Sequence, residues 1–391
     1  ANPTATSVIM VGSDEQVPMA RVRDQAWTFN EAEFADEAVD GTPNPISVSA
    51  QQGFVLSDTP YAISTPSLAG QEALMLPDMG IGRLVESPAT IQGLLDNYTK
   101  NAGQLYVTKK GFSVQRYGYG FLADGTNAMG ANLIAGTGSE AAGSVVNDSW
   151  DGSALTGTSG AFSATGAAAA TVLNAHFDPR RLLAACGDPI VTPAPSCLTP
   201  LVGTAAAIAP SLPGKLLMSV GCHSGLNIPN GYVPGNSPLA ADWAETFANQ
   251  GASVWVGNTG YGYGDSDVVG YSEQLMTNFA DQLTQAPNAG LALAYAKQQY
   301  QGGLSALSDI DLKVMAESTL YGLPLWVGLN PNRTPVTKVT RALTGSSTGY
   351  TYADLQITPT LTSVASPRGT YYTASAAGAV ATVAATPGMP L

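Results

Sequence analysis

Three cysteines and two histidines are the residues of this chain best suited to covalent chemistry. Cys222 comes directly after the apolar run Leu216–Val220 and Gly221. A continuous apolar run that ends at a glycine is typical of a buried parallel strand, and open α/β sheets carry their sites at the carboxyl ends of such strands. Most cysteines pack as small apolar residues, but the polar turn at Ser224 and Gly225 favours a reactive thiol here.

A thiol needs a base to become a nucleophile near neutral pH, and the chain offers only His176 and His223. His223 is next to Cys222, and adjacent residues of an extended segment point to opposite faces. His176 follows the short apolar stretch Thr171–Leu173, so it also ends a predicted strand. Two adjacent parallel strands would bring His176 and Cys222 to the same edge of the sheet, which predicts His176 as the base. A hydrogen-bonded structural histidine is the alternative interpretation.

The other two cysteines, Cys186 and Cys197, bound the segment CGDPIVTPAPSC, which contains three prolines and has neither helical nor strand periodicity. Two cysteines at the ends of a short proline-rich loop are well placed for a disulfide, which would fit an oxidising compartment. Two free thiols in a reducing cell are the alternative. The predicted pairing leaves Cys222 as the free cysteine.

Predicted strands alternate with predicted helices over most of the chain, which indicates an α/β fold with a mostly parallel sheet covered on both faces. Ser87 and Ser237, each followed by proline, are predicted helix N-caps, and two amphipathic helices are predicted at 272–285 and 289–301. Residues 125–166, which are rich in glycine, serine, alanine and asparagine, are interpreted as a long surface excursion.

The pattern changes near residue 331, where threonine, valine and tyrosine recur without a helical period. We therefore predict an α/β domain over residues 1–330 and a β-rich C-terminal segment over 331–391, with an incomplete immunoglobulin-like module as one interpretation of the latter. A chain of 391 residues is long enough to hold a large core and a small additional domain.

Composition narrows the classes of partner and the location of the protein. The formal net charge is −13 with only 16 lysines and arginines, which argues against nucleic-acid binding because phosphates require a concentrated basic surface. No apolar run approaches the roughly 20 residues that span a bilayer. The chain begins at Ala1 without a signal peptide, and its 12% charged residues are typical of exported proteins. We expect a mature or excised part of a longer, secreted or cell-surface multidomain chain.

Seven sequence blocks resemble, in order, the landmarks of gingipain-like cysteine peptidases: VIMVGSDEQVPMARVRD, VLSDTPYA, LPDMGIGRL, GYGFLADG, SVGCHSGLN, GNTGYGYGD and LYGLPLWV. The resemblance implies a three-layer α/β/α sandwich of the caspase–gingipain type. It also implies a secreted cysteine endopeptidase that acts on proteins or peptides. The family places its catalytic histidine on the strand before the cysteine strand, and His176 and Cys222 keep this order.

The resemblance also implies further parts of a catalytic site. The family's histidine is usually followed by glycine, but Phe177 stands here, which changes the backbone donor expected near the histidine. The N–H of Cys222 would be the other donor to an oxyanion. An acidic residue that orients the histidine is expected near FLADG, where Asp124 is the candidate and an ordinary Asp-Gly turn is the alternative. Asp178 is a weaker candidate because it lies only two residues from the histidine.

Members of this family select the side chain before the cleaved bond through a pocket beside the cysteine. The loop GNTGYGYGDSD is expected to line that pocket together with Gly221. Asp265 or Asp267 in this loop could receive an arginine or lysine through a charge-assisted pair.

No organic cofactor is needed for the implied reaction, whereas calcium as a structural ion is implied by the resemblance. The loop that contains Asn147, Asp148 and Asp151 offers oxygen ligands of the kind that calcium prefers. A solvated polar loop is the alternative interpretation.

Two rival functions remain. The first is a non-catalytic cell-surface adhesion or assembly module that keeps the peptidase fold, which the replacement of glycine by Phe177 and the β-rich segment would favour. The second is an α/β-hydrolase, because GCHSG resembles a nucleophile elbow. Its central residue would be His223, and no later histidine completes the required order, which argues against it.

Overall fold

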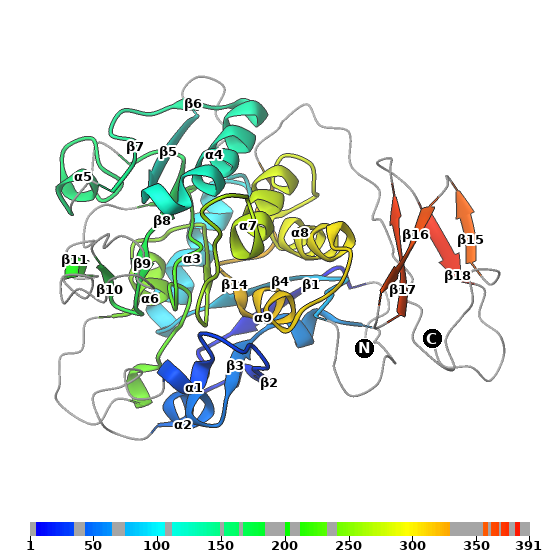
Figure 1. The fold of residues 1–391 in the computed structure, drawn as a ribbon. Helices are drawn as coiled ribbons and strands as arrows, with labels where there is room; N and C mark the ends of the chain where they lie inside the picture. Colours follow the sequence, from blue (N-terminus) through cyan, green and yellow to red (C-terminus); the bar gives the residue numbers. More distant parts are fainter. Residues whose placement is uncertain are drawn as a thin grey trace.

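Strands and helices alternate along the chain in the computed structural model, and they form a central sheet with helices on both faces (Figure 1). The described residues are 5–34, 44–64, 75–105, 112–148, 152–163, 167–183, 200–203, 212–232, 241–328, and the strand segments 355–358, 361–366, 369–374 and 380–383.

The central sheet has the strand order β1-β4-β14-β13-β12-β8-β5-β6, and β7 also pairs with β5. Its strands are β1 (Ser7–Val11), β4 (Gly80–Leu84), β5 (Ser113–Gly118), β6 (Ser139–Glu140), β7 (Val145–Val146), β8 (Ala170–Asn174), β12 (Leu216–Met218), β13 (Val254–Asn258) and β14 (Ser318–Tyr321). Neighbouring strands are parallel except β13 and β14. Two parallel blocks therefore meet at one antiparallel junction, and the predicted mostly parallel sheet is confirmed.

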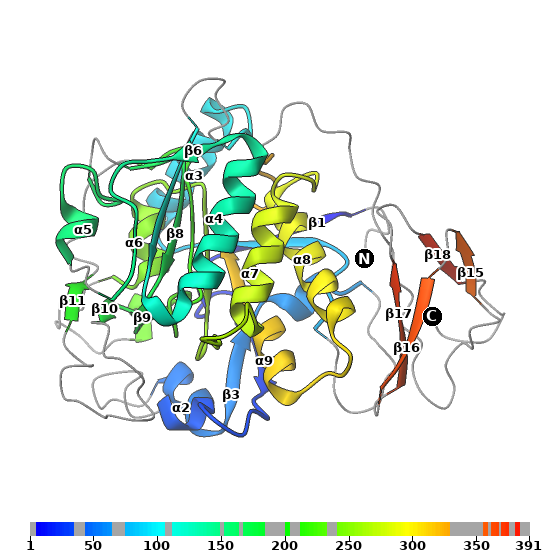
Figure 2. The same ribbon diagram turned by 45° about the horizontal axis from the view of Figure 1, so that its top comes forward.

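Helices cover both faces of this sheet, as the predicted three-layer sandwich requires. In Figure 2, α4, α7 and α8 lie side by side on one face, while α3 and α6 lie on the other. The helices are α1 (Glu31–Phe34), α2 (Pro45–Gln51), α3 (Pro88–Lys100), α4 (Ala123–Thr137), α5 (Gly152–Thr156), α6 (Trp243–Asn249), α7 (Tyr271–Gln282), α8 (Ala289–Gly303) and α9 (Asp309–Glu317). Short 3₁₀ turns are η1 (Thr59–Ala62), η2 (Gly120–Leu122) and η5 (Asn230–Tyr232).

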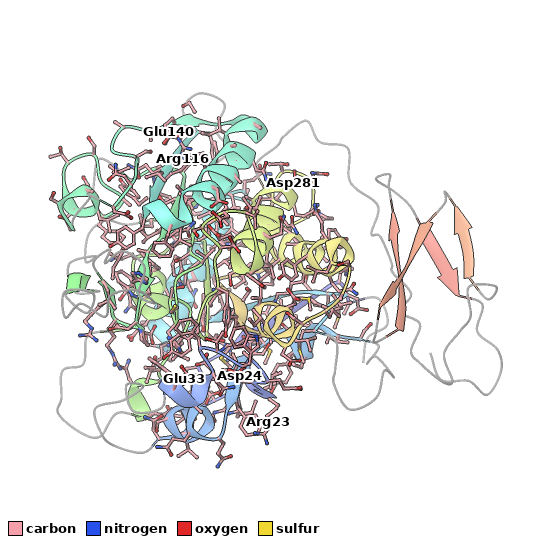
Figure 3. All side chains as sticks on the ribbon, viewed as in Figure 1. Arg23, Asp24, Glu33, Arg116, Glu140 and Asp281 are labelled. Carbon is pink, nitrogen blue, oxygen red and sulfur yellow. The ribbon has the colours of Figure 1, made fainter. Side chains whose placement is uncertain are left out.

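Smaller antiparallel pairings flank the central sheet. They are formed by β2 (Ala20–Arg23) with β3 (Phe54–Ser57), and by β10 (Arg181–Leu183) with β9 (His176–Phe177) and β11 (Pro200–Gly203). At the sheet's β6 edge, Arg116 and Glu140 form an ion pair of 2.8 Å (Figure 3).

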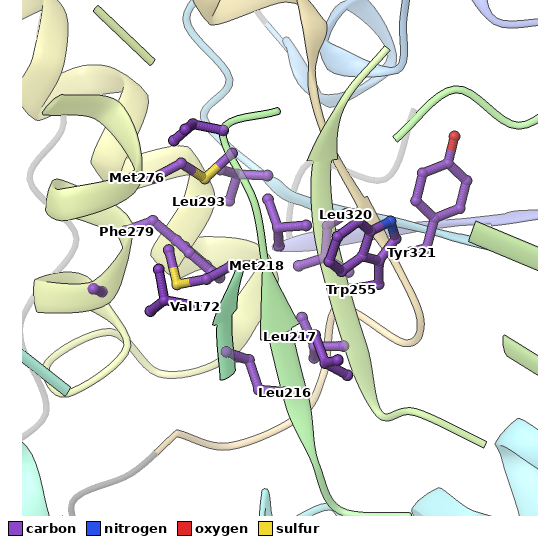
Figure 4. Packing of buried hydrophobic residues seen from close by; sticks show 14 of the residues in the cluster. Val172, Leu216, Leu217, Met218, Trp255, Met276, Phe279, Leu293, Leu320 and Tyr321 are labelled. Carbon is purple, nitrogen blue, oxygen red and sulfur yellow. The ribbon is translucent and has the colours of Figure 1, made fainter. Parts of the chain in front are cut away.

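The core lies between the sheet and the helices, and the central strands supply it from both faces. Val172 of β8 and Met218 of β12 lie toward Met276 and Phe279 of α7, and all four are buried (Figure 4). Trp255 of β13 is buried as well. Strands that are covered on both faces must be apolar throughout, which is why these strands read as continuous hydrophobic runs in the sequence.

Two helix starts were predicted from serine N-caps that are followed by proline. The predicted cap at Ser87 is confirmed, since its hydroxyl accepts the N–H of Thr90 at 3.1 Å and Pro88 begins α3. Ser237 lies outside the described residues, so its predicted cap stays a prediction; the described helix α6 begins at Trp243 and is capped by Asp242, which accepts the N–H of Glu245 at 2.9 Å. The helices predicted at 272–285 and 289–301 are confirmed as α7 and α8.

The prediction of a surface excursion over residues 125–166 was wrong, because most of α4 lies in this range and the helix packs on β5 and α7. Its glycines are needed for that packing. A side chain at Gly125 would collide with Glu273 of α7, and one at Gly130 would collide with Arg116 of β5. Small residues that suggest a loop in the sequence here allow close helix packing.

Beyond residue 328 the structure describes two antiparallel strand pairs, β15 (Leu355–Thr358) with β18 (Val380–Val383) and β16 (Leu361–Ser366) with β17 (Gly369–Ala374). The domain boundary at residue 330 and the immunoglobulin-like module stay predictions. Cys186 and Cys197 lie outside the described residues, so their disulfide also stays a prediction. No helix in the described part of the chain is both long and apolar enough to cross a membrane.

Candidate active site

The segments that follow β8 and β12 run side by side at the carboxyl edge of the sheet. These strands are parallel, and their described ladder ends with Met218 opposite Val172. The N–H of Val220 donates to the Asn174 side chain at 3.1 Å, which holds the two segments together beyond the ladder. Cys222 and His176 therefore both follow the carboxyl ends of neighbouring parallel strands, β12 and β8, as the parallel-strand argument expected; their direct contact stays a prediction.

Cys222 lies half-buried in the turn after β12. Its thiol is 3.7 Å from the carbonyl oxygen of Gly262, in the loop that follows β13. Burial raises the pKa of the Cys222 thiol to about 11, and the nearby carboxyl groups of Glu317 and Glu31 add to this rise. The thiol is therefore protonated near neutral pH in the resting protein.

The backbone of the turn around Cys222 is almost fully hydrogen-bonded. Within residues 219–226, the N–H groups of all residues except Cys222 have acceptors, such as Gly260 O for His223 at 2.7 Å and Asn258 O for Gly225 at 2.8 Å. The N–H of Cys222 donates to no group among the described residues. Unpaired N–H groups are rare at such positions, and this one lies on the same residue as the thiol.

His176 is half-buried at the start of β9, where its backbone pairs with β10. The ring of Phe121 stacks on the imidazole with centroids 5.0 Å apart, and Tyr119 lies 6.0 Å away. Burial lowers the pKa of His176, and the charge of Asp148 partly opposes this. The imidazole is therefore neutral at pH 7, and its Nε2 has no hydrogen-bond partner among the described residues.

The orienting carboxylate predicted at Asp124 lies in the first turn of α4, where Oδ1 accepts the N–H of Gly125 at 2.9 Å. In the described part of the chain no hydrogen bond links it to His176. Asp148, which the sequence placed in a calcium loop, is the carboxylate whose charge acts on His176. Its Oδ1 accepts the N–H of Gly120 at 2.6 Å, next to Phe121. Asp148 is thus a second candidate for the carboxylate that orients the histidine. Its position depends on the pairing of β7 with β5, which no local sequence signal indicates.

The predicted specificity residues follow Gly262. Oδ1 of Asp265 accepts the N–H groups of Asp267 at 2.8 Å and Val268 at 3.3 Å, so its carboxylate stabilises its own turn. Asp267 is exposed. Gly221 packs tightly, since a Cβ there would meet the Phe177 ring and come 3.0 Å from Ala175 O.

Beneath this loop, sequence reasoning missed Glu273, which is fully buried in the first turn of α7. Its Oε2 accepts the N–H of Asp265 at 3.1 Å. Burial and the charges of Asp124 and Asp265 raise the pKa of Glu273 to about 8. In the sequence this residue looks like an ordinary glutamate of an amphipathic helix.

Among the described residues, no group of three or more histidine, cysteine, aspartate or glutamate side chains could hold a metal ion. Asp151 of the predicted calcium loop lies outside the described residues. Calcium as a structural ion therefore stays a prediction.

The strand order and the helices on both faces define a three-layer α/β/α sandwich with a mostly parallel sheet. No family model and no curated protein matches the sequence. Among solved structures, the complex of Porphyromonas gingivalis RgpB pro- and mature domains matches with a TM-score of 0.51 at 12% identity, over 96% of this chain and 81% of that one.

The Arg-specific cysteine proteinase gingipain R also matches, with a TM-score of 0.44 at 13% identity, over 95% of this chain and 78% of that one. A Saccharomyces cerevisiae separase–securin complex matches with a TM-score of 0.37 at 12% identity, over 63% of this chain and 14% of that one. The RgpB match shows that this chain has a gingipain-like cysteine peptidase fold.

Proposed function

We propose that this chain is a cysteine endopeptidase in which Cys222 is the nucleophile and His176 is the general acid and base. The observation that carries the proposal is that, within the turn 219–226, only the N–H of Cys222 itself has no acceptor among the described residues. An oxyanion formed by attack of the thiol would lie within reach of this donor. His176 follows β8, the parallel neighbour of the strand that precedes Cys222, which supports its role as the base.

The protonation states of the two side chains suit general-base catalysis. The raised pKa of Cys222 and the lowered pKa of His176 mean that the resting pair is a thiol and a neutral imidazole. His176 would take the thiol proton as sulfur attacks the peptide carbonyl carbon, then give it to the leaving amine. Water would hydrolyse the thioester with His176 again as base. Catalytic hydrogen bonds often form or shorten only when substrate binds. The proposal is therefore compatible with the absence of a hydrogen bond between Cys222 and His176 in the free protein.

The substrate is proposed to be a protein or peptide that binds beside Gly221 and the loop with Asp265 and Asp267. Asp267 is the more available of the two carboxylates for a cationic side chain, because Asp265 already accepts two backbone N–H groups. The function is proposed to be exercised outside the cell or at its surface.

Substitution of Cys222 or His176 by alanine should reduce peptide hydrolysis by about 10³-fold or more, because each removes a group that acts directly on the reacting atoms. Cleavage of fluorogenic peptides with arginine, lysine, aspartate or a neutral residue before the cleaved bond would measure this. Glu33→Gln, on the exposed side of α1, is the control that should leave activity unchanged. Full activity in Cys222→Ala would refute the proposal, and a preference for aspartate or a neutral residue would refute the role of Asp267.

A non-catalytic adhesion or assembly module is the second candidate, and one observation favours it. In the described structure the Phe121 ring covers the imidazole of His176, and no hydrogen bond joins that imidazole to Cys222. Iodoacetamide distinguishes the two functions. A thiol that stays unreactive up to pH 10 in the folded protein, together with no cleavage of any peptide, would favour the non-catalytic module.

A further inference from the structure

His223, directly after the candidate nucleophile, has a backbone conformation that is rare for residues with a side chain. Its φ is +53°, in the left-handed region, which is unfavourable for L-residues other than glycine. Such conformations persist only where the surroundings impose them, and they cluster at functional sites. The turn that presents Cys222 therefore depends on whatever holds His223.

Contacts from two other parts of the chain hold the imidazole of His223. The ring of Phe34 stacks on it with centroids 3.5 Å apart and an interplanar angle of 16°. Nε2 lies 2.9 Å from Oε2 of Glu31, and both side chains are almost completely buried. The backbone N–H also donates to Gly260 O at 2.7 Å, in the loop that carries Gly262.

Glu31 is itself held from two sides. Its Oε1 accepts the N–H of Tyr261 at 2.9 Å and lies 2.8 Å from Nζ of Lys313 on α9. Lys313 also pairs with Asp24 at 2.7 Å. Burial alone would raise the pKa of Glu31, but His223 and Lys313 lower it to about 2, so the carboxylate is charged at any working pH. A continuous series of polar side-chain contacts thus runs from Asp24 through Lys313 and Glu31 to His223, the residue that follows Cys222.

We infer that His223 and Glu31 are positioning residues for Cys222. By fixing His223 in its left-handed conformation they hold the turn that carries Cys222, and with it the direction of the thiol and of the Cys222 N–H one peptide unit earlier. This inference rests on the proposed endopeptidase function. A glycine at position 223 would reach this conformation without strain. Here the position is occupied by His223, whose side chain is held by Phe34 and Glu31. The backbone is therefore restricted to one conformation, whereas glycine would allow several.

The pKa of Cys222 depends on the ionisable groups near it. A change in this pKa therefore distinguishes the loss of a nearby charge from a mere loss of packing. Glu317 and Glu31 raise the pKa of Cys222, and Lys313 lowers it. Glu31→Gln keeps the shape of the side chain and removes one of the charges that raise this pKa. The pH midpoint of alkylation of Cys222 by iodoacetamide should therefore move to lower pH in this variant, while its kcat should fall because the thiol is no longer correctly directed.

The experiment compares Glu31→Gln and His223→Asn with Glu33→Gln, which removes a carboxylate from the exposed side of the same helix; Figure 3 labels Asp24 and Glu33 in this region. Near-ultraviolet circular dichroism verifies folding. We expect kcat for a cleaved peptide to fall about tenfold or more in both variants, with KM changed by about twofold at most, because small misplacements of a nucleophile are costly. The control should match the wild type in every measurement.

Folded Glu31→Gln and His223→Asn variants with wild-type kcat would overturn the inference, even if the peptidase proposal stands. If the wild type cleaves no peptide, the proposed function fails, and alkylation alone decides: an unchanged midpoint in Glu31→Gln and an unchanged rate in His223→Asn would overturn the positioning role. If either variant fails to fold, Phe34→Leu replaces it, since leucine keeps an apolar contact but removes the ring stack. Wild-type kcat and alkylation in folded Phe34→Leu would then also overturn the inference.

Discussion

At the scale of single residues, the candidate site keeps its two reactive groups uncharged at rest. The thiol of Cys222 is half-buried beside Gly262 O with a raised pKa, and the imidazole of His176 lies under Phe121 with a lowered pKa. Desolvation disfavours the charged form of either group, so both shifts follow from the same cause. A protonated thiol is less susceptible to oxidation than a thiolate, so the raised pKa should protect Cys222.

Replacing Asp148 by asparagine should lower the pKa of His176, because this carboxylate opposes the effect of burial by attracting the protonated ring. Removing it destabilises the imidazolium, so the ring loses its proton at lower pH. NMR titration of the His176 ring protons measures the shift directly, and His223 provides the only other histidine signal. If activity is detected, the acid limb of kcat/KM should move in the same direction.

Asp124→Asn is the matched control and should leave the titration of His176 unchanged. The reverse pattern, a shift in Asp124→Asn and none in Asp148→Asn, would restore Asp124 as the carboxylate that acts on the histidine.

At the scale of elements, glycines allow helices and strands to approach each other closely. A Cβ on Gly290, in the first turn of α8, would lie 2.5 Å from the Cβ of Pro324 and 3.1 Å from Cα of Gly80 on β4. These distances are well below normal contact between carbon atoms. The 43 glycines of this chain therefore do not mark loops alone, which is why α4 was mistaken for a surface excursion.

Two glycine-to-alanine substitutions in helices should have opposite effects on stability. Gly93 of α3 has no atom within 4 Å of a built Cβ, so Gly93→Ala should stabilise the protein by roughly 0.5–1 kcal/mol through helix propensity. Gly290→Ala should destabilise it by about 1–3 kcal/mol, because the same gain is outweighed by overpacking against β4. Urea unfolding measures both free energies, and a stabilising Gly290→Ala would show that α8 can move away from the sheet without cost.

At the scale of the whole molecule, distant parts of the chain meet around Cys222. The turn after β12 contacts the segment after β8, the loop after β13 and helix α1, and α9 contributes Lys313 to the same cluster. The site therefore depends on the complete α/β domain. A partly folded chain would not assemble it.

Cys186 and Cys197 should be found as a disulfide in protein prepared under oxidising conditions. Alkylation without reduction, followed by peptide mass spectrometry, should show these two residues cross-linked and Cys222 alkylated once the chain is denatured. Closure of so short a loop should stabilise the protein by roughly 3 kcal/mol relative to the reduced form. Alkylation of all three cysteines without reduction would contradict the prediction and remove the main argument for an oxidising compartment.

Local patterns in the sequence were sufficient to predict the class of fold and the position of the candidate nucleophile. The apolar run before Cys222 has the length and continuity of a buried parallel strand, and that local pattern was sufficient to place the thiol at a carboxyl edge. The sequence also made His176 the predicted partner, because only two histidines exist and His223, as the neighbour of Cys222, is expected to point to the opposite face.

The other groups that surround these residues could not be predicted, because long-range packing brings them there. Asp148, Glu31, Lys313 and Glu273 reach the site through strand pairing and helix packing between segments that are remote in sequence. The charge of a residue is local information, but its effect on a pKa depends on burial and on distances to other charges, which only the folded chain sets. For the same reason the sequence identified His223 as a poor base but could not show that a stacked ring and a buried carboxylate hold it beside the thiol.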